Sequence, residues 1–195
     1  MLISYNWLKE FIPDLACSPG EVAEQLTTHS FETKVSRQVK IDPKILVAKV
    51  IKIEVHPKAD RLRLVTVKTG KEEVTGVCGA KNVQEGMLVP FSPVGTTLLD
   101  ETGKPFQLTM AKIRGVESPG MLNSPRELGL GDWHGGIYSL PEEVAIGTPL
   151  CSYIIDDVIL EADVTPNRAH DCLCHMGIAR ELAAVLNLAV REIEA

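Results

Sequence analysis

The stretch HPKADRLRLVTVKTG, residues 56–70, decides the fold predicted for the middle of the chain. Pro57 disfavours the α region for the residue before it, so a strand leading into this stretch is expected to end at His56. Asp60 suits the turn that follows, because its carboxylate can accept backbone N–H bonds. The Thr-Gly pair at positions 69 and 70 predicts a tight reversal into the next strand. The stretch therefore predicts a strand, a turn and a second strand.

The second of these strands carries two arginines. From position 61 the order Arg-Leu-Arg-Leu alternates as a half-buried strand does, which predicts Arg61 and Arg63 on the outer face. The alternation slips at residues 64 and 65, and the slip indicates a bulge or a strand buried on both faces. Positive charge is thus expected to point outward from the hairpin, toward a partner or toward water.

From position 45 onward the residue pattern is typical of a small β-barrel. Short runs rich in Val, Ile, Leu and Thr are separated by Gly, Pro and Asn turns. The runs are ILVAKVIKIEV, LRLVTV, EEVTGV, MLVPFSPV, FQLTMAKI and GMLNS. Five or six strands in roughly a hundred residues fit a partly open five-stranded OB barrel. We therefore predict an OB-fold domain over residues 41–150.

The segment before the barrel is predicted to be helical first and extended afterwards. Ser4 can cap a short helix, and the order Ser-Pro-Gly-Glu at residues 18–21 is a capping box with proline at the first helical position. The apolar residues at helical spacing are Trp7, Leu8, Phe11 and Ile12 in the first helix and Val22 and Leu26 in the second. Residues 31–39 are expected to be extended.

The segment after position 150 is predicted to hold a strand, a turn and a helix. The run VILEADV, residues 158–164, alternates as a strand does, and TPNRAHD forms the turn. A helix follows over residues 169–187. Its apolar stripe consists of Leu173, Ile178, Leu182 and Val185.

Each flank is too short to bury a sound core alone, so the two are expected to form one domain. We predict an α+β, mainly β fold in which an OB-fold β-barrel is inserted into a small discontinuous helical domain. Residues 1–40 and 151–195 form that domain, and residues 41–150 form the barrel.

Composition is that of an ordinary globular protein. Of the 195 residues 45% are hydrophobic, and no apolar run approaches the roughly 20 residues of a membrane span. The opening MLISYNWLKEF lacks a basic segment followed by an apolar core, so no secretory signal is predicted. The five cysteines are odd in number and scattered, which favours reduced thiols and a cytoplasmic location.

Charge is distributed unevenly along the chain. The net charge of −6 argues against indiscriminate nucleic-acid binding. Residues 45–150 hold twelve basic and twelve acidic residues, whereas residues 151–195 hold three basic and eight acidic ones. The middle is therefore neutral with its lysines and arginines grouped, and the contrast indicates two units.

Candidate RNA-binding residues gather in the basic hairpin and in AKIRGVESPGMLNSPRELG, residues 111–129. OB barrels bind single-stranded or looped nucleic acid on one strand face, with cations on phosphates and flat or flexible side chains on bases. Lys112 and Arg114, at a strand end before a turn over residues 115–120, can contact phosphates, and Met121 can form an apolar platform. The predicted binding residues are Lys58, Arg61, Arg63, Lys81, Asn82, Lys112, Arg114, Ser118, Met121 and Ser124.

A charged face that contacts only water is the alternative. The aromatic residues of this region that could stack on bases lie outside the basic motif, at Phe91, Phe106, Trp133 and Tyr138.

The sequence HDCLCH, residues 170–175, contains four possible zinc ligands. On a continuous helix His170 and Cys174 would share a face while Cys172 and His175 would point elsewhere. The spacing is not that of a structural zinc site, and a helix opening with a small buried cysteine explains it, so no metal is predicted.

No catalytic residue is predicted. The G-x-S-x-G, H-E-x-x-H and Walker-type motifs are absent from the sequence. Cys78 could act as a nucleophile with His56 or His134, but no third orienting residue is apparent and a strand-end cysteine favours packing.

The ordered motifs resemble those of one family. HPKADRL, VCGAKN, KIRGVESPGMLNS, ELGLGD, VTPNRAHD and GIAREL, with NWLKEF at the start, resemble the N-terminal region of the bacterial phenylalanyl-tRNA synthetase β subunit. The middle also resembles the OB-type tRNA-binding domain that other synthetases carry and that exists as free-standing proteins. Two positions depart from the pattern, with Lys81 where proline is common and Asn123 where cysteine is common.

This resemblance implies an α₂β₂ ligase that attaches phenylalanine to its tRNA with ATP and magnesium. It places aminoacylation in the α subunit and editing in later parts of β, so this segment is expected to carry no catalytic, editing or cofactor site. The sequence ends at REIEA, just after a helix, as a fragment would. The implied partners are tRNA, the α subunit and the remainder of β. The alternatives are a free-standing OB-fold tRNA-binding protein and a scaffold that only packs subunits.

Overall fold

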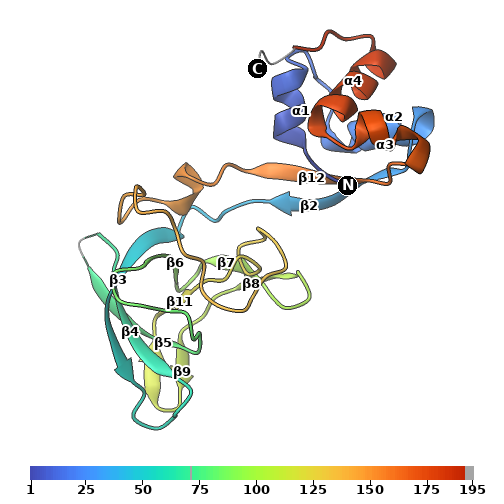
Figure 1. Cartoon of the computed structure of the whole chain (residues 1–195). Helices are drawn as coiled ribbons and strands as arrows, with labels where there is room; N and C mark the ends of the chain where they lie inside the picture. Colours follow the sequence, from blue (N-terminus) through green and yellow to red (C-terminus); the bar gives the residue numbers. More distant parts are fainter. Residues whose placement is uncertain (71, 192–195) are drawn as a thin grey trace. The chain divides into compact units, whose positions relative to one another are not determined.

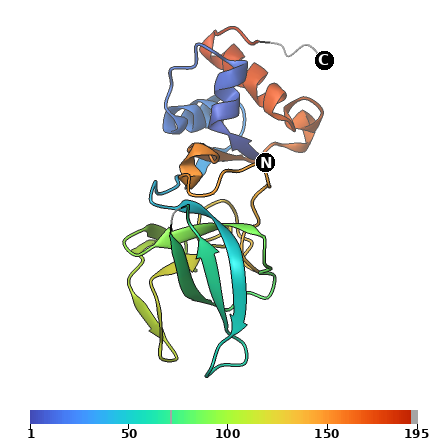
Figure 2. The same ribbon diagram turned by 90° about the vertical axis from the view of Figure 1, so that its left-hand side faces the viewer.

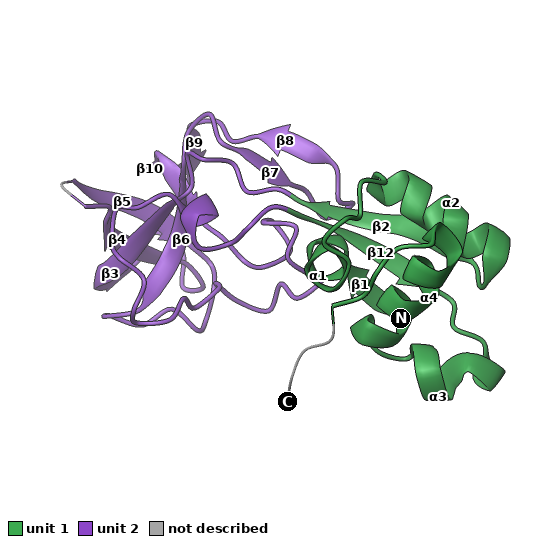
Figure 3. Ribbon diagram, turned by 90° about the horizontal axis from the view of Figure 1, so that it is seen from above, with its two compact units in different colours: residues 1–39, 157–195 green, residues 40–156 purple. Residues whose placement is uncertain are grey.

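The computed structural model describes residues 1–70 and 72–191, which form two compact units (Figures 1 and 3). Unit 1 consists of Met1–Val39 and Asp157–Ala195, and unit 2 is the continuous segment Lys40–Asp156. The later border lies at Asp156 rather than at residue 150, because Cys151 and Ile154 pack against a core cluster of unit 2 and Asp156 accepts the backbone N–H of Ile41.

Unit 2 is built on a five-stranded antiparallel sheet with the order β11-β6-β3-β4-β5. Its strands are β3 (Leu46–Val55), β4 (Arg63–Lys68), β5 (Glu73–Cys78), β6 (Leu88–Pro93) and β11 (Gly120–Leu122). Figure 2 shows these strands curling into a barrel. The predicted end of the incoming strand at His56 is confirmed, since β3 stops at Val55.

One serine draws the two edges of this sheet together. The Ser118 hydroxyl accepts a bond from the backbone N–H of Val77 on β5 at 3.1 Å. It donates to the carbonyl of Gly120 on β11 at 2.9 Å. The sheet is therefore nearly closed, and the predicted OB-type barrel is confirmed.

The barrel interior is filled by small and branched apolar side chains. One cluster is formed by Ala48, Val50, Val65, Val67, Cys78, Val83, Val89, Phe91 and Ile137. Gly120 passes so close to Phe91 that a Cβ there would lie 2.3 Å from the ring. A second cluster consists of Ile41, Ile45, Val47, Leu88, Leu98, Leu128, Leu140 and Leu150.

The bulge in this sheet lies on β3, whereas the sequence indicated either a bulge or burial on both faces at residues 64 and 65 of β4. Opposite β4 the register of β3 shifts between Val50 and Lys52, and β4 itself pairs regularly. Side chains on a regular strand alternate faces, so Arg63 starts the row that continues with the buried Val65. The prediction that Arg63 lies on the outer face is therefore wrong. The break in alternation at residues 64 and 65 arises because the sequence passes there from the polar turn into β4.

Two short hairpins complete unit 2, and they differ from the predicted FQLTMAKI strand. One pairs β7 (Thr97–Leu99) with β8 (Pro105–Gln107), and the other pairs β9 (Ala111–Ile113) with β10 (Val116–Ser118). Between β8 and β9 the backbone of residue 108 bonds instead to residues 95 and 96.

The predicted turn over residues 115–120 is also wrong. Ile113 pairs with Val116, so the reversal consists of Arg114 and Gly115 alone. Both residues have positive φ, 51° and 94°, as a two-residue hairpin turn matched to the strand twist requires.

Unit 1 packs helices on a three-stranded antiparallel sheet with the order β1-β12-β2 (Figure 1). The strands are β1 (Leu2–Ser4), β12 (Asp157–Ala162) and β2 (Thr33–Val39). The helices are α1 (Tyr5–Phe11), α2 (Pro19–His29), α3 (Ala169–Cys172) and α4 (His175–Leu186), with 3-10 turns at Pro166–Arg168 and, in unit 2, at Leu150–Ser152. Both α1 and α2 contact α4, and their buried faces form one core.

Both predicted helix caps are confirmed. The Ser4 hydroxyl accepts the backbone N–H of Trp7 at 3.1 Å, and Ser18 forms the full capping box with Glu21. The predicted extended segment after α2 is β2. These features depend on neighbours in sequence, which is why the sequence alone determines them.

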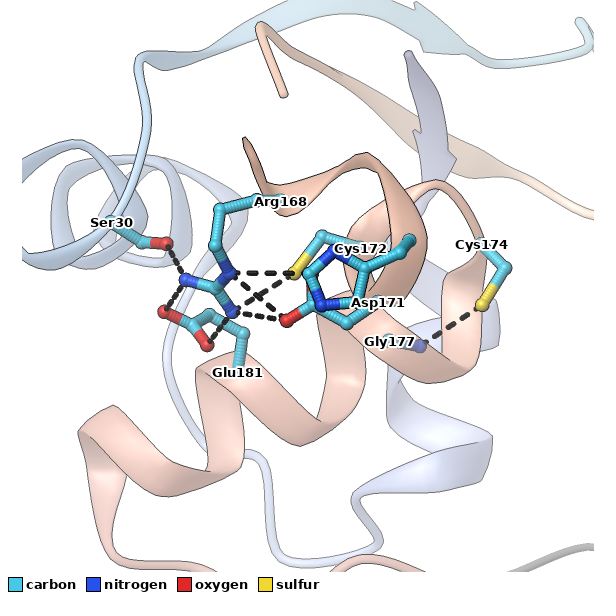
Figure 4. Close-up of polar contacts among 8 residues, drawn as sticks. Ser30, Arg168, Asp171, Cys172, Cys174, Gly177 and Glu181 are labelled. Atoms are coloured by element: carbon cyan, nitrogen blue, oxygen red, sulfur yellow. Dashed lines mark hydrogen bonds and ion pairs between the residues drawn. The ribbon is translucent and has the colours of Figure 1, made fainter. Parts of the chain in front are cut away.

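The predicted continuous helix over residues 169–187 is wrong, because the chain breaks into α3 and α4 (Figure 4). Gly177 of α4 lies against the end of α3, so a Cβ built on it would be 1.7 Å from the carbonyl oxygen of Asp171. The thiol sulfur of Cys174 caps α4 by accepting the backbone N–H of Gly177 at 3.3 Å. Leu173, expected on the apolar stripe, is consequently 57% exposed.

The guanidinium of Arg168 joins the segments around this break (Figure 4). Its Nη2 donates to Asp171 at 2.8 Å and to Glu181 of α4 at 2.6 Å, and its Nη1 reaches the Ser30 hydroxyl after α2 at 3.4 Å. The hydrogen bonds from Arg168 lower the pKa of both carboxyl groups. Arg168, which lies within the predicted TPNRAHD turn, thus ties α2, α3 and α4 together.

In residues 1–70 and 72–191 no helix is long and apolar enough to span a membrane.

The close approach at Gly177 predicts a large effect of a single methyl group. We expect Gly177→Ala to lower the free energy of unfolding of unit 1 by about 1–3 kcal/mol, because the new Cβ would force α3 and α4 apart. The matched control is Gly20→Ala near the start of α2, where a Cβ would meet nothing within 4 Å. Urea unfolding followed by Trp7 emission in a Trp133→Phe background measures both, and equal stabilities of the two variants would contradict the packing account.

Candidate nucleic-acid interface

The turn between β3 and β4, residues 56–62, is organised around a buried histidine. The side chain of His56 is 2% exposed. Its backbone N–H donates to Leu62 at 3.2 Å, and its ring nitrogen Nδ1 accepts the backbone N–H of Lys58 at 3.1 Å. Because Nδ1 accepts, the ring hydrogen is on Nε2. The sequence indicated only that the strand ends here.

The same histidine ties this turn to the β9–β10 hairpin. Nε2 of His56 lies 3.3 Å from the carbonyl oxygen of Ile113, which it can donate to. The ammonium nitrogen of Lys58 lies 3.7 Å from the position that a Cβ on Gly115 would take. Two turns more than fifty residues apart in sequence therefore lie next to each other at one end of the barrel.

The turn at residues 56–62 and the β9–β10 hairpin carry four cations, and we name them the basic end: Lys58, Arg61, Lys112 and Arg114. All four side chains are exposed. None of them forms an ion pair with another residue of the described ranges, whereas Lys34, Lys52 and Arg168 do. Unpaired exposed cations on neighbouring turns suit contacts with a phosphate backbone.

Arg114 takes a conformation that is costly for its residue type. Its φ of 51° lies in the left-handed region, which costs an L-residue other than glycine, asparagine or aspartate roughly 1–2 kcal/mol. Asn-Gly is the preferred pair for this kind of turn, yet the chain has Arg-Gly. A strained residue with an exposed charge is a typical feature of functional loops.

Arg63 does not belong to the basic end. It is half-buried on the inner row of β4, and its Nη1 lies 3.5 Å from the carbonyl oxygen of Val83. It pairs in register with Cys78, whose thiol pKa is raised by burial. That burial disfavours the thiolate a nucleophile needs. The two ring nitrogens of His56, its suggested base, both face backbone groups.

The predicted hydrogen-bonding residues hold the protein's own backbone. Both amide atoms of Asn82 bond the backbone of Ile137, each at 2.9 Å. Ser118 closes the barrel, as described above, and the hydroxyl of Ser124 donates to Glu127 at 2.8 Å. The polar atoms of these three side chains are thus already hydrogen-bonded within the protein.

A hollow of about 520 Å³ opens beside the basic end, and we name it the side hollow. Its lining includes Lys81, Met121, Leu122, Ser124, Glu127 and His134. The methyl group Cδ2 of Leu62, in the His56 turn, lies 3.5 Å from the Cβ position of Gly79 on its wall. Neither Glu127 nor the wall at residues 134–137 was predicted from the sequence. The Gly-Gly pair at 135 and 136 was the one sequence feature that could have indicated this wall.

The HDCLCH residues have separate roles in unit 1. His170 is exposed, Cys172 is buried beside Arg168, and Cys174 caps α4. His175 accepts the backbone N–H of Ser4 at 3.0 Å, and burial lowers its pKa. The expected pairing of His170 with Cys174 on one helix face is wrong, because α3 ends at Cys172. Within the described ranges no three His, Cys, Asp or Glu side chains gather as a metal site.

Comparison with known protein families matches the barrel. Residues 45–149 match the family model described as "Putative tRNA binding domain", which spans more than half of the chain. The chain belongs to this family.

Relatives along nearly the whole chain are ligase subunits. The phenylalanine–tRNA ligase beta subunit of Chlorobaculum tepidum is 45% identical over 94% of this chain and 23% of that protein. The same subunit of Dehalococcoides mccartyi is 43% identical over 96% of this chain and 23% of that protein. The chain thus spans about 23% of the length of these relatives and matches their N-terminal part.

Among solved structures, a MetRS-related protein from Pyrococcus horikoshii is 28% identical over 54% of this chain and 87% of that one, with a TM-score of 0.38.

The strained turn predicts that Arg114→Asn stabilises unit 2. We expect the free energy of unfolding to rise by about 1 kcal/mol, because asparagine adopts the left-handed region more easily than arginine. Arg61→Asn, at an exposed turn position without positive φ, is the control and should leave stability nearly unchanged. Urea unfolding followed by Trp133 emission in a Trp7→Phe background measures both. A stability of Arg114→Asn at or below that of the parent would contradict the strain argument.

Proposed function

We propose that unit 2 binds tRNA through the basic end. One observation carries the proposal. His56 ties the turn at residues 56–62 to the β9–β10 hairpin at one end of an OB-type barrel, and these two segments present four exposed cations that form no ion pair within the described ranges, although Glu117 lies opposite Lys112 in the hairpin. The match of residues 45–149 to a tRNA-binding family supports it.

Binding of this kind rests on the phosphate backbone. Each cation that neutralises a phosphate releases a condensed counterion, so affinity falls as salt rises. The barrel is neutral overall, which limits attraction to RNA as a whole and makes the local grouping of cations decisive. The expected complex is therefore weak, specific for one face of the barrel and dependent on salt.

The ten predicted binding residues divide into two groups under this proposal. Lys58, Arg61, Lys81, Lys112, Arg114 and Met121 contact the RNA. Arg63, Asn82, Ser118 and Ser124 position the loops that carry them, because their polar atoms already bond the protein backbone or Glu127.

We further propose that the chain is the N-terminal part of a β subunit of a cytoplasmic ligase that charges tRNA with phenylalanine. The identity with the Chlorobaculum relative supports this proposal. Its partners are then an α subunit, in an α₂β₂ enzyme, and the remainder of β. ATP and magnesium serve the other parts of that enzyme.

Unit 1 then serves as a packing unit within the subunit. Its fixed core and the Arg168 network give a rigid body, and exposed apolar residues such as Trp7 and Leu173 suit contacts with other parts of the enzyme. A purely structural role for the whole chain is the competing proposal, and the following experiment separates the two.

The test compares two charge-matched variants in a tRNA titration at several salt concentrations. One variant replaces the basic end with alanine at Lys58, Arg61, Lys112 and Arg114. The other replaces four exposed lysines elsewhere in unit 2, namely Lys40, Lys49, Lys68 and Lys104. We expect the basic-end variant to bind tRNA at least about tenfold more weakly than the parent. The slope of log K against log salt should become less steep by about 0.7–0.9 for each phosphate contact that is lost.

The control variant should bind nearly as the parent does, although its net charge changes equally. Equal losses in both variants would mean nonspecific attraction. If the parent does not bind even at low salt, tRNA binding by this chain is excluded and the packing role stands.

A further inference from the structure

The wall of the side hollow is fixed before any ligand arrives. Asn82 clamps the backbone of Ile137 through both amide atoms at 2.9 Å, and the backbone of Tyr138 donates to Asn123 at 2.9 Å. Gly136 lies so close to this clamp that a Cβ would be 2.3 Å from the Asn82 amide oxygen. A preformed hollow costs little ordering entropy when it binds a ligand.

Its size and lining suit one small, flat, partly polar group. The volume of about 520 Å³ falls within the range of ligand sites, roughly 300–1,000 Å³. Met121 and Leu122 supply apolar surface, and the exposed ammonium group of Lys81 lies at the hollow. An apolar floor with a cation beside it matches a nucleobase with its phosphate.

A large exposed aromatic ring stands beside this hollow. The indole of Trp133 lies 3.3–3.4 Å from the Cβ position of Gly135, a lining residue, and the side chain is 54% exposed. Aromatic rings in such places stack on unpaired bases, with about 1–3 kcal/mol per base in nucleic-acid-binding proteins. In the sequence Trp133 lay outside the basic motif, but the fold places its ring against Gly135, which lines the hollow.

Glu127 supplies a hydrogen-bond acceptor on the same wall. Its Oε2 accepts the backbone N–H of Ser124 at 2.6 Å and the Ser124 hydroxyl at 2.8 Å, which fixes the carboxylate. Its Oε1 accepts no hydrogen bond from residues in the described ranges. A carboxylate repels phosphate but accepts the amino group of cytosine, and the amino groups of adenine and guanine likewise.

We infer that the side hollow holds one unpaired nucleobase, stacked on Trp133 with its amino group toward Glu127 and its phosphate near Lys81. This inference deepens the proposed function and rests on it, because the base would belong to RNA whose backbone contacts the basic end. Leu62, which follows Arg61 in the chain, lies with its Cδ2 3.5 Å from the Cβ position of Gly79, so the turn that carries Arg61 adjoins the wall of the hollow. Bases with an amino group are therefore favoured over uracil.

The sequence offers a direct probe of this site. The chain has two tryptophans, so a Trp7→Phe protein reports on Trp133 alone. We would titrate it with hexacytidylate and hexauridylate at low salt and follow the emission. We expect quenching by both as bases stack, with roughly three- to tenfold tighter binding of the cytosine oligomer.

The matched variant is Glu127→Gln, which keeps the shape. The amide oxygen can retain the bonds from Ser124, which turns the amide NH₂ toward the base. The preference for cytosine should therefore vanish or reverse toward uracil. Trp133→Phe, read by anisotropy of labelled oligomers, should keep most of the affinity, while Trp133→Ala should lose it.

Several outcomes would overturn the inference without touching the proposed function. The first is tRNA binding that depends on the basic end but leaves Trp133 emission unchanged. The second is equal affinity for the two oligomers, both in the parent and in Glu127→Gln. The third is quenching of Trp133 by double-stranded RNA that equals the quenching by the single-stranded oligomers. Absence of any binding by tRNA and by both oligomers would overturn the inference and the proposed function together. Oligomer quenching without tRNA binding would leave the hollow as a base site and remove the tRNA proposal.

Discussion

The candidate interface depends on the two hydrogen bonds of the His56 ring. One holds the backbone of Lys58 within its own turn, and the other reaches the carbonyl of Ile113 on a distant hairpin. A buried ring with a donor at one nitrogen and an acceptor at the other can satisfy two separate backbone groups, which no apolar side chain can do. The positions of the cations on both segments relative to each other therefore depend on this ring.

Features that depend on neighbouring residues could be predicted from the sequence. The caps at Ser4 and Ser18, the strand end at His56 and the barrel itself follow from local hydrogen bonding and periodicity. The helix break before α4 could not, because it depends on the backbone contact between Gly177 and Asp171. Amphipathic spacing continues through the break and gives no sign of it.

The same distinction applies to the site. The exposed cations were identified correctly as a group, since Lys and Arg at turns and strand ends are seldom buried. The inward face of Arg63 was missed, because the sequence was read as a strand from residue 61, whereas β4 begins at Arg63 and its inner row continues with Val65 and Val67. Glu127 and the wall near Trp133 lie in irregular segments without periodicity, so only the fold brings them to the hollow. At Arg114 the positive charge is kept at the expense of stability, because arginine is unsuited to the left-handed backbone conformation of this position.

The central claim is that one buried histidine joins two distant turns into a single RNA-binding surface. The most direct measurement is the tRNA affinity of His56→Phe beside His56→Gln, with Trp133 emission and urea unfolding confirming a folded barrel in each. Phenylalanine fills the space without either hydrogen bond, whereas glutamine has both a donor and an acceptor. We expect the phenylalanine variant to bind tRNA several-fold more weakly although no charged side chain has been removed, and glutamine to restore part of the affinity. A folded phenylalanine variant that binds tRNA as tightly as the parent would contradict it.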